Sequence, residues 1–377
     1  MDAHKVPPPS AVGQIAELLD SPEIAVLVRD LEGTRWTGRP GYPLRSMVGM
    51  ALAKSMYAIP TWTKTVALVR EHAGLRTAVV GSLSSDVPSV FACYRFTAKL
   101  RAYSDMLTGC IDRVTAGLSD QLPEYGRNVA IDGSDMPAYA NGQRFVSKNG
   151  RERKRFSDPD ASWGHRSAVS TRKGGGFYGY KVHAVVCVVT GLPVAWTVET
   201  ASEAETNFAL PLIDAARERG FAVDVAIADK GYDNGPFHDG CMDRNVLPVT
   251  PLRETPAVKR GDHHAPTCEH GTWTFAGADF KRRATKWRCP SGECKPKSRW
   301  VKADRLHPLI PRETPRFTAL YRRRASVERE FGRLKHDWAL APLRVRGLDR
   351  VRLHADLTIL AKLACALNRA RAALVAA

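Results

Sequence analysis

Between residues 128 and 250 the sequence alternates short β-rich runs with helical segments, and this order constrains the fold more than any other feature. Residues 129–132 predict a strand that ends in Asp-Gly-Ser, and two longer β-rich runs are joined by Thr190-Gly191, a hairpin signal. A helix, a buried strand, a second helix and a last strand are expected to follow. The elements after the first strand are expected at 180–189, 192–200, 205–219, 223–228, 234–244 and 246–250. We therefore expect an α/β fold with a mixed sheet flanked by helices.

The residues before this region predict helices only. Apolar side chains recur at helical spacing from residue 11 to about residue 121, which indicates an all-helical domain at residues 1–125. The helix expected at 88–100 carries Arg95 and Lys99 and is followed by Arg101, so it could enter a DNA groove. Small helical domains also place basic residues outward for solubility, and that alternative stays open. The expected helices are 11–19, 44–57, 61–72, 88–100 and 103–118.

The chain is strongly basic. Its 377 residues include 56 Lys and Arg against 39 Asp and Glu, which gives a net charge of +17. Such an excess favours nucleic acid as the partner, ahead of an anionic membrane or an acidic substrate. No run approaches the roughly 20 apolar residues of a membrane helix, and five of the eight cysteines are scattered, mostly in apolar surroundings. We expect a cytoplasmic protein with no membrane partner and no disulfide framework.

Two more helices are expected beyond an insertion at about residues 251–316, which is rich in Pro, Gly, Trp, Cys and basic residues. Residues 317–338 predict one continuous basic helix, and residues 349–375 predict a final amphipathic helix. On the first of these helices, four polar residues fall within an arc of about 60° at about 100° per residue. They are Tyr321, Arg324, Glu328 and Lys335.

Three acidic residues of the predicted strands and helices could form one site. Asp132 closes the first expected strand, and Asp229 closes the strand that follows a helical crossover. If these strands are parallel neighbours, both carboxylates emerge at the same edge of the sheet, and Glu328 would supply the third. Oxygen ligands of this kind suit Mg²⁺ or Mn²⁺, and paired ions support phosphoryl displacement. The alternative has both aspartates as turn residues and Glu328 in a helix salt bridge, and the residues alone do not decide between them.

The run from Tyr321 to Lys335 resembles the Y-x2-R-x3-E-x6-K signature of bacterial insertion-sequence transposases of the DDE class, with all four positions matched. Three other blocks are also similar to this group. They are Ile131-Asp132-Gly-Ser, Asp229-Lys-Gly-Tyr232 and, in the amino-terminal part, Gly38-Arg-Pro-Gly-Tyr-Pro43. The resemblance covers most of the chain.

The resemblance implies a ribonuclease-H-like catalytic domain at residues 126–377 behind an amino-terminal DNA-binding domain. It implies that Asp132, Asp229 and Glu328 hold Mg²⁺ or Mn²⁺. It further implies cleavage at terminal inverted repeats, joining of the freed 3′ end to target DNA, and a homodimer that pairs two double-stranded ends. By the same analogy Tyr321, Arg324 and Lys335 contact the DNA backbone. A simple metal-dependent nuclease and a catalytically inactive DNA-binding derivative are the competing functions.

Two neighbouring acids compete with this assignment. Asp135 lies three residues past Asp132, and we prefer Asp132 because it ends the expected strand. Glu330 lies two residues past Glu328 and would therefore point about 200° away from the face of Tyr321 and Lys335. We expect a change of Glu330 to be nearly silent.

The insertion contains a candidate zinc site. Cys268 and His270 are followed about twenty residues later by Cys289 and Cys294, and together these four could form a tetrahedral set. The spacing is not one of the regular zinc-finger patterns, and His263 and His264 also compete for the fourth position. The alternative is a group of reduced thiols without metal in a β-rich insertion.

Overall fold

The computed structural model describes residues 11–34, 41–82, 86–142, 156–166, 173–255 and 265–375. Most of the basic stretch between residues 143 and 172, part of the Gly38–Pro43 block, and His263 and His264 lie outside these ranges. Within the described ranges, no helix combines the length and the apolar character needed to cross a bilayer.

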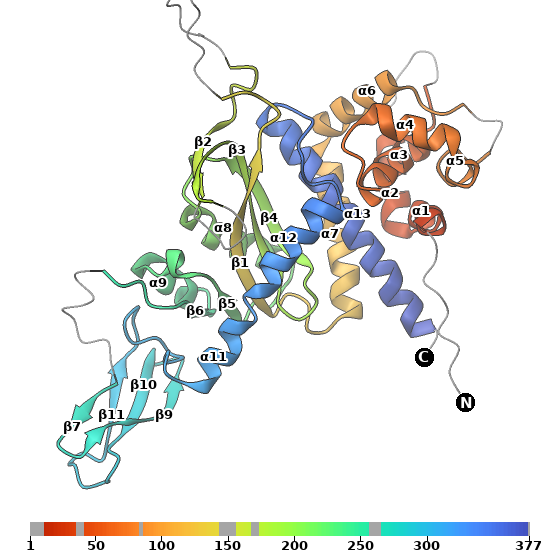
Figure 1. The fold of residues 1–377 in the computed structure, drawn as a ribbon. Coiled ribbons are helices and arrows are strands. Elements are labelled where there is room, and N and C mark those ends of the chain that lie inside the picture. Colours follow the sequence, from red (N-terminus) through yellow and green to blue (C-terminus); the bar gives the residue numbers. More distant parts are fainter. Residues whose placement is uncertain are drawn as a thin grey trace, which may run out of the picture.

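The expected mixed sheet is present at the centre of the molecule (Figure 1). Its strand order is β2-β3-β1-β5-β6, and β4 pairs with the same long strand β3. β3 is antiparallel to β1, β2 and β4, whereas β5 and β6 run parallel to β1. A three-stranded antiparallel unit continued by two parallel strands is the arrangement of a ribonuclease-H-like fold, which confirms the expected fold class. The strands are β1 (Asn128–Pro137), β2 (Ser162–Arg166), β3 (Gly175–Cys187), β4 (Pro193–Thr200), β5 (Val225–Ile227) and β6 (Leu247–Val249).

Local sequence explains these strands and their connections. The second half of β3 is almost entirely buried, as its run of Val and Ala predicts. Gly191 adopts a positive φ of 69° in the turn to β4, a conformation that a residue without Cβ takes without strain. The crossover from β5 to β6 uses α9 (Gly235–Asp243), which Asn234 caps by accepting a hydrogen bond from the Phe237 amide at 2.9 Å.

Helices cover both faces of the sheet. α8 (Thr206–Glu218) packs on β3 and β4, and α12 (Ala325–Asp337) packs on β1 and β3. Figure 1 shows α12 passing in front of the strands while α8 lies behind them. α13 (Leu348–Val375) continues from α12 and packs both on β4 and on the amino-terminal helices α3 and α7. One continuous apolar core therefore joins the helical part to the sheet.

The amino-terminal part is helical, as expected, and it contains two helices, α2 and α5, that were not among those predicted. α2 and α5 follow their predecessors after a single residue each, Ser21 and His72. His72 ends one helix and caps the next, because its ring accepts a hydrogen bond from the Leu75 amide at 3.1 Å. The helices are α1 (Ala11–Asp20), α2 (Pro22–Gly33), α3 (Leu44–Met56), α4 (Trp62–Glu71), α5 (Ala73–Val80), α6 (Val90–Ala102) and α7 (Ser104–Gln121).

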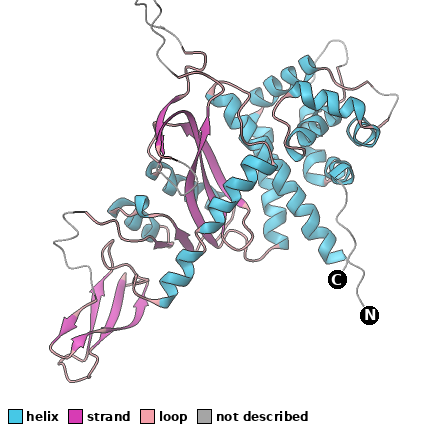
Figure 2. Cartoon of the chain, in the orientation of Figure 1, coloured by secondary structure: helices cyan, strands magenta, loops and turns pink. Residues whose placement is uncertain are grey.

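The insertion forms a small sheet apart from the central one (Figure 2). Its three-stranded part has the order β11-β10-β9, and β7 and β8 make a separate two-stranded ribbon. Trp273, Trp287 and Cys289 form its own small core. The strands are β7 (Thr267–Cys268), β8 (Gly271–Thr272), β9 (Thr274–Asp279), β10 (Ala284–Arg288) and β11 (Ser298–Lys302).

Two expected boundaries are wrong. The first strand does not end at Asp132, because β3 is long enough to pair with β1 as far as Pro137. The helix expected at 317–338 is two helices, α11 (Pro315–Arg322) and α12. At the junction the Arg323 and Arg324 amides bond to carbonyls three residues back, at 3.0 and 2.9 Å. Such tighter bonds interrupt the α-helical hydrogen-bond pattern at this point.

Candidate active site

The parallel pairing of β1 with β5 places Asp132 beside Asp229. The last paired residues of β1 and β5 are Ala130 and Ile227, and each aspartate lies two residues beyond the last paired residue on its own chain segment, Asp132 still within β1 and Asp229 after β5. The pKa of Asp132 is raised to about 7, first by burial and further by the negative charges of Asp229 and Glu205, against the lowering effect of Arg324. Two carboxylates this close repel each other, so the site favours a cation or a proton between them.

The turn after β5 holds the Asp229 carboxylate in place. Asp229 caps the short 3₁₀ helix η1 (Lys230–Tyr232), and its Oδ1 accepts a hydrogen bond from the Gly231 amide at 2.7 Å. A Cβ at position 231 would lie 2.9 Å from that same oxygen, too close without moving the carboxylate. Glycine at the third position of the Asp-x-Gly pattern is thus explained by the lack of space for a Cβ beside the Asp229 carboxylate.

Asp132 is held by its own strand and by a cation. Its Oδ1 accepts from the Gly133 amide at 2.8 Å, and its Oδ2 accepts from Arg324 Nη1 at 3.1 Å. A Cβ at position 133 would meet Glu205 and His183 at 3.0–3.1 Å, so this neighbour of Asp132 must be small.

Arg324 also forms an ion pair with Glu328, so one guanidinium bridges two of the three predicted acids. The Glu328 side chain is 55% exposed, whereas that of Glu330 is fully buried and accepts a hydrogen bond from Lys362 Nζ at 2.6 Å. The two glutamates therefore point in opposite directions, and Glu328 is the one on the side of Asp132.

The three carboxylates do not form a tight cluster. Within the described part of the chain, only a group of three cysteines brings metal-binding atoms within 4.8 Å of one another. The positive charge of Arg324 lies between Asp132 and Glu328 and offsets their repulsion. Arg324 contacts two of the three carboxylates, those of Asp132 and Glu328, and the three together are an oxygen donor set that fits a hard divalent ion.

The other residues of the expected polar face are engaged within the chain. Lys335 Nζ donates to the Asp135 carbonyl at 2.6 Å, and the Asp135 carboxylate pairs with Arg166 at 3.0 Å. Asp135, the competing aspartate, is thus neutralised separately from the acids around Arg324. Tyr321 stacks on Phe317, with ring centroids 5.9 Å apart, and belongs to α11 rather than to the helix of Glu328.

The structure adds side chains near this site that the assignment from sequence did not include. Glu205, which precedes α8, pairs with Lys181 of β3 at 2.9 Å. Tyr232 is buried, and burial together with the charges of Asp132, Glu205 and Asp229 raises its pKa well above the usual value. Lys181 and His183 are two polar residues in an otherwise apolar strand. This pattern was the signal in the sequence by which the polar residues of β3 near the site could have been found.

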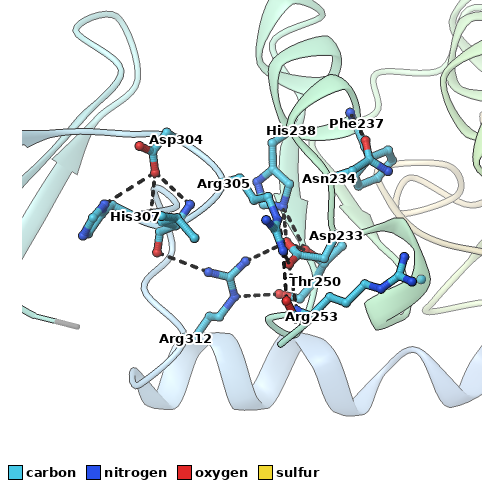
Figure 3. A network of polar contacts seen from close by, with 12 residues as sticks. Asp233, Asn234, Phe237, His238, Thr250, Arg253, Asp304, Arg305, His307 and Arg312 are labelled. Carbon is cyan, nitrogen blue, oxygen red and sulfur yellow. Dashed lines mark hydrogen bonds and ion pairs between the residues drawn. The ribbon is translucent and has the colours of Figure 1, made fainter. Parts of the chain in front are cut away.

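Figure 3 shows how the insertion is attached to the same turn. Asp233, directly after Tyr232, has a fully buried side chain that pairs with Arg305 at 2.9 Å and with Arg312 at 3.0 Å. Burial alone would raise the pKa of Asp233, but hydrogen bonds from His238, the Arg253 amide and Arg305, together with the charge of Arg312, hold it well below its usual range. The chain leaving the insertion toward α11 is thereby fixed to the turn that carries Asp229.

Comparisons with known proteins agree with this architecture. Residues 126–363 match the family model described as "Transposase DDE domain", and residues 3–98 match the one described as "Transposase domain (DUF772)". No curated protein sequence matches the chain significantly. Among solved structures, the chain is similar to a cryo-EM structure of the piggyBac transposase synaptic complex with hairpin DNA, at 11% identity and a TM-score of 0.41. That match covers 97% of this chain and 75% of the other.

Proposed function

Because this chain belongs to the DDE transposase family and is a DNA transposase, we propose that it cuts DNA at the terminal inverted repeats of an insertion sequence and joins the freed 3′ ends to target DNA. Asp132, Asp229 and Glu328 are proposed as its catalytic acids. The observation that carries this assignment is the position of Asp132 and Asp229, each two residues beyond the last paired residues of the parallel strands β1 and β5, with Arg324 linking Asp132 to Glu328.

The same three carboxylates would hold Mg²⁺ or Mn²⁺. When bound, such ions stabilise the attacking and the leaving oxygen of a phosphoryl displacement. The protein contributes the fixed position of Asp229 through the Gly231 amide and that of Asp132 through the Gly133 amide. Arg324 neutralises the acids in the absence of metal, and we propose that its guanidinium turns to a DNA phosphate only once the acids hold the metal.

A second surface supports contact with DNA. A cavity of about 400 Å³ lies between the amino-terminal helices and the connection from α12 to α13. Lys54, Arg101, Arg344 and Arg350 line it, and none of its lining residues is acidic. α6 beside it exposes Phe91 (76%) and Tyr94 (53%). A basic cavity with exposed aromatic rings is suited to phosphates and bases, so we assign α6 and this cavity to binding of the transposon end.

Joining two ends requires two active sites, and we propose a homodimer that pairs the two inverted repeats in the cytoplasm. Tyr321 and Lys335 are proposed to reach the DNA backbone in that complex. Both are engaged within the chain in this structure, Tyr321 with Phe317 and Lys335 with Asp135, so this role requires them to exchange partners.

The test is cleavage and joining of labelled inverted-repeat ends with Mg²⁺ or Mn²⁺. Asp132→Asn, Asp229→Asn and Glu328→Gln should each abolish both reactions and leave end binding largely intact. Asp337→Asn, an exposed acid on the same helix as Glu328, is the matched control and should retain activity. Cleavage without joining would indicate a nuclease, and binding without cleavage by the wild type would indicate an inactive derivative.

A further inference from the structure

We propose that Cys268, Cys289 and Cys294 bind a structural zinc ion that holds the insertion sheet together. Their sulfur atoms all lie within 4.8 Å of one another. They come from three separate places in the chain, namely β7, the end of β10, and the loop before β11. This site lies in the small sheet of the insertion, and it goes beyond the proposed function, which needs only the three acids.

The spacing of the sulfurs suits a shared cation. Thiolates that bind zinc tetrahedrally at 2.3 Å lie about 3.8 Å from one another, and Cys268 Sγ lies 3.9 Å from Cys289 Sγ. A disulfide would require a separation of about 2.05 Å. The five remaining cysteines, by contrast, are buried singly in the main core.

The surroundings support thiolate ligands. Ser291 Oγ lies 3.3 Å from Cys289 Sγ, within the range of a hydrogen bond to sulfur, and the Ser291 hydroxyl also accepts from the Glu293 amide at 3.2 Å. The loop between Cys289 and Cys294 is therefore folded around its first sulfur. Such contacts orient ligands in metal sites generally.

The insertion also needs a cross-link. Its sheet spans about 40 residues, a length at which disulfides or metals are usually required for stability. Its buried core consists of only Trp273, Trp287 and Cys289, with a few half-buried side chains around them. Because Cys268 belongs to the separate ribbon of β7 and β8, a metal bridge would join this ribbon to β10.

Of the four ligands predicted from the sequence, the structure brings three together. His270 instead lies between Glu269 and Glu293, at 3.3 and 3.4 Å. Its ring is next to Glu293, the residue before Cys294, so it is a candidate for the fourth position. Our assignment rests on the three thiols.

Metal analysis of the full chain, purified without chelator, tests the site. We expect about one zinc per chain, falling to less than about 0.2 in Cys289→Ser. Cys241→Ala, which changes an isolated buried thiol in α9, should keep its zinc. Replacement by Co²⁺ should add a thiolate-to-metal charge-transfer band in the wild type and the control only.

The zinc and the catalytic acids are tested separately. Asp132→Asn should lose cleavage and keep zinc, whereas chelation of zinc should expose the insertion to proteases and change the fluorescence of Trp273 and Trp287. Folded wild-type protein that contains no zinc and takes up none when it is supplied would overturn the proposal. Zinc content that is unchanged in Cys289→Ser would overturn it as well.

Discussion

At the scale of single residues, Arg324 and Glu330 show how two charged positions of the basic helix differ in role. Arg324 lies between Asp132 and Glu328 at the surface of the site. Glu330 is fully buried against Lys362. Burial raises the pKa of Glu330 to about 7 and lowers the pKa of Lys362, so the loss of hydration outweighs their mutual attraction.

The sequence predicts that Glu330→Gln leaves cleavage nearly unchanged, and the buried pair with Lys362 adds that this substitution should lower stability. Lys362 would remain buried without an opposite charge, and we expect a loss of about 1–3 kcal/mol in the free energy of unfolding. Denaturant titration measures the loss, and cleavage per folded molecule should stay at the wild-type level. In the double variant Glu330→Met, Lys362→Met, most of the stability should return, because replacing both partners of a buried pair is often neutral. A double variant less stable than Glu330→Gln would contradict this account.

The choice of Glu328 over Glu330 could be made from the sequence, because helical phase within one helix depends only on local geometry. The position of Tyr321 on a separate helix, α11, could not be predicted from the sequence. The tight bonds at Arg323 and Arg324 divide the helix, and no Gly or Pro marks this point in the run Arg322-Arg-Arg-Ala325. The break lies where Arg324 reaches Asp132, a contact across 192 positions of sequence that no local pattern contains.

At the scale of elements, the order of strands and helices in residues 128–250 was predictable except for β2, because the other elements carry their own hydrophobic patterns, whereas no strand was expected at residues 162–166. The extension of β1 was not predictable either, since Gly-Ser-Asp-Met-Pro has the composition of a turn. Only pairing with the far half of β3, from Gly133 with His183 to Pro137 with Gly179, makes it a strand. The helices α2 and α5 were likewise missed, since no helix was expected at residues 22–33 or 73–80.

The attachment of the insertion makes a prediction at this scale. Asp233→Asn should loosen the contact of Arg305 and Arg312 with the turn of Asp229, because it leaves two cations without their shared buried charge. We expect a loss of about 3–5 kcal/mol, the range for breaking a buried ion pair. Limited proteolysis should cut faster between residues 250 and 315, and cleavage of DNA should fall. Asp304→Asn, an exposed neighbour that caps its own loop, is the control. Unchanged proteolysis of Asp233→Asn would show that the network does not hold the insertion.

The contact between α13 and β4 predicts a dependence on pH. Asp356 accepts a hydrogen bond from Trp196 Nε1 at 2.8 Å, and burial raises its pKa to about 6. A carboxyl group with a raised pKa binds its proton more tightly in the folded state. The contribution of this carboxyl group to the free energy of unfolding is therefore complete at low pH and is lost as the pH rises through about 6.

Asp356→Asn keeps the acceptor for Trp196 and removes the titration. The free energy of unfolding of Asp356→Asn, taken relative to that of the wild type, should therefore increase by about 2 kcal/mol between pH 4 and pH 7. Thermal or denaturant unfolding at several pH values measures this change. Asp349→Asn, which changes a side chain that is 80% exposed on the same helix, should show the same pH dependence of the unfolding free energy as the wild type. A relative stability of Asp356→Asn that does not change with pH would refute the assignment.

At the scale of the whole molecule, α13 makes the helical part and the sheet one body. It packs on α3, α7 and β4, and near its end Arg371 pairs with Glu23 of α2 at 2.6 Å. The sequence predicts the helix itself, but its packing against residues more than 200 positions away depends on the completed fold. The basic cavity arises from the same packing, since its cations come from α3, α6, the connection before α13 and the first turn of α13.

This arrangement separates two groups of cations that the sequence alone treats alike. The sequence predicts that Arg324 and Lys335 bind the DNA backbone, and its alternative is that they pair with acids of the same chain. In the structure both are paired in this way, with Asp132, Glu328 and Asp135. Arg344, in contrast, lies over the ring of Tyr139 at 5.0 Å and lines the cavity.

We therefore expect the salt dependence of end binding to distinguish the two groups. Each phosphate contact releases counterions, so its loss should flatten the log–log slope of affinity against salt by about one unit. Arg344→Ala and Arg101→Ala should each do so, while cleavage at saturating DNA persists. Arg324→Ala and Lys335→Ala should impair cleavage and leave the slope nearly unchanged when no divalent metal is present. Arg329→Ala, on an exposed position of the same helix, should change neither. Affinity measured at four salt concentrations distinguishes the two groups. A flatter slope for Arg324→Ala than for Arg344→Ala would show that the DNA follows the active-site helix rather than the cavity, because Arg324 can release counterions from the DNA only if it leaves its carboxylates for a phosphate.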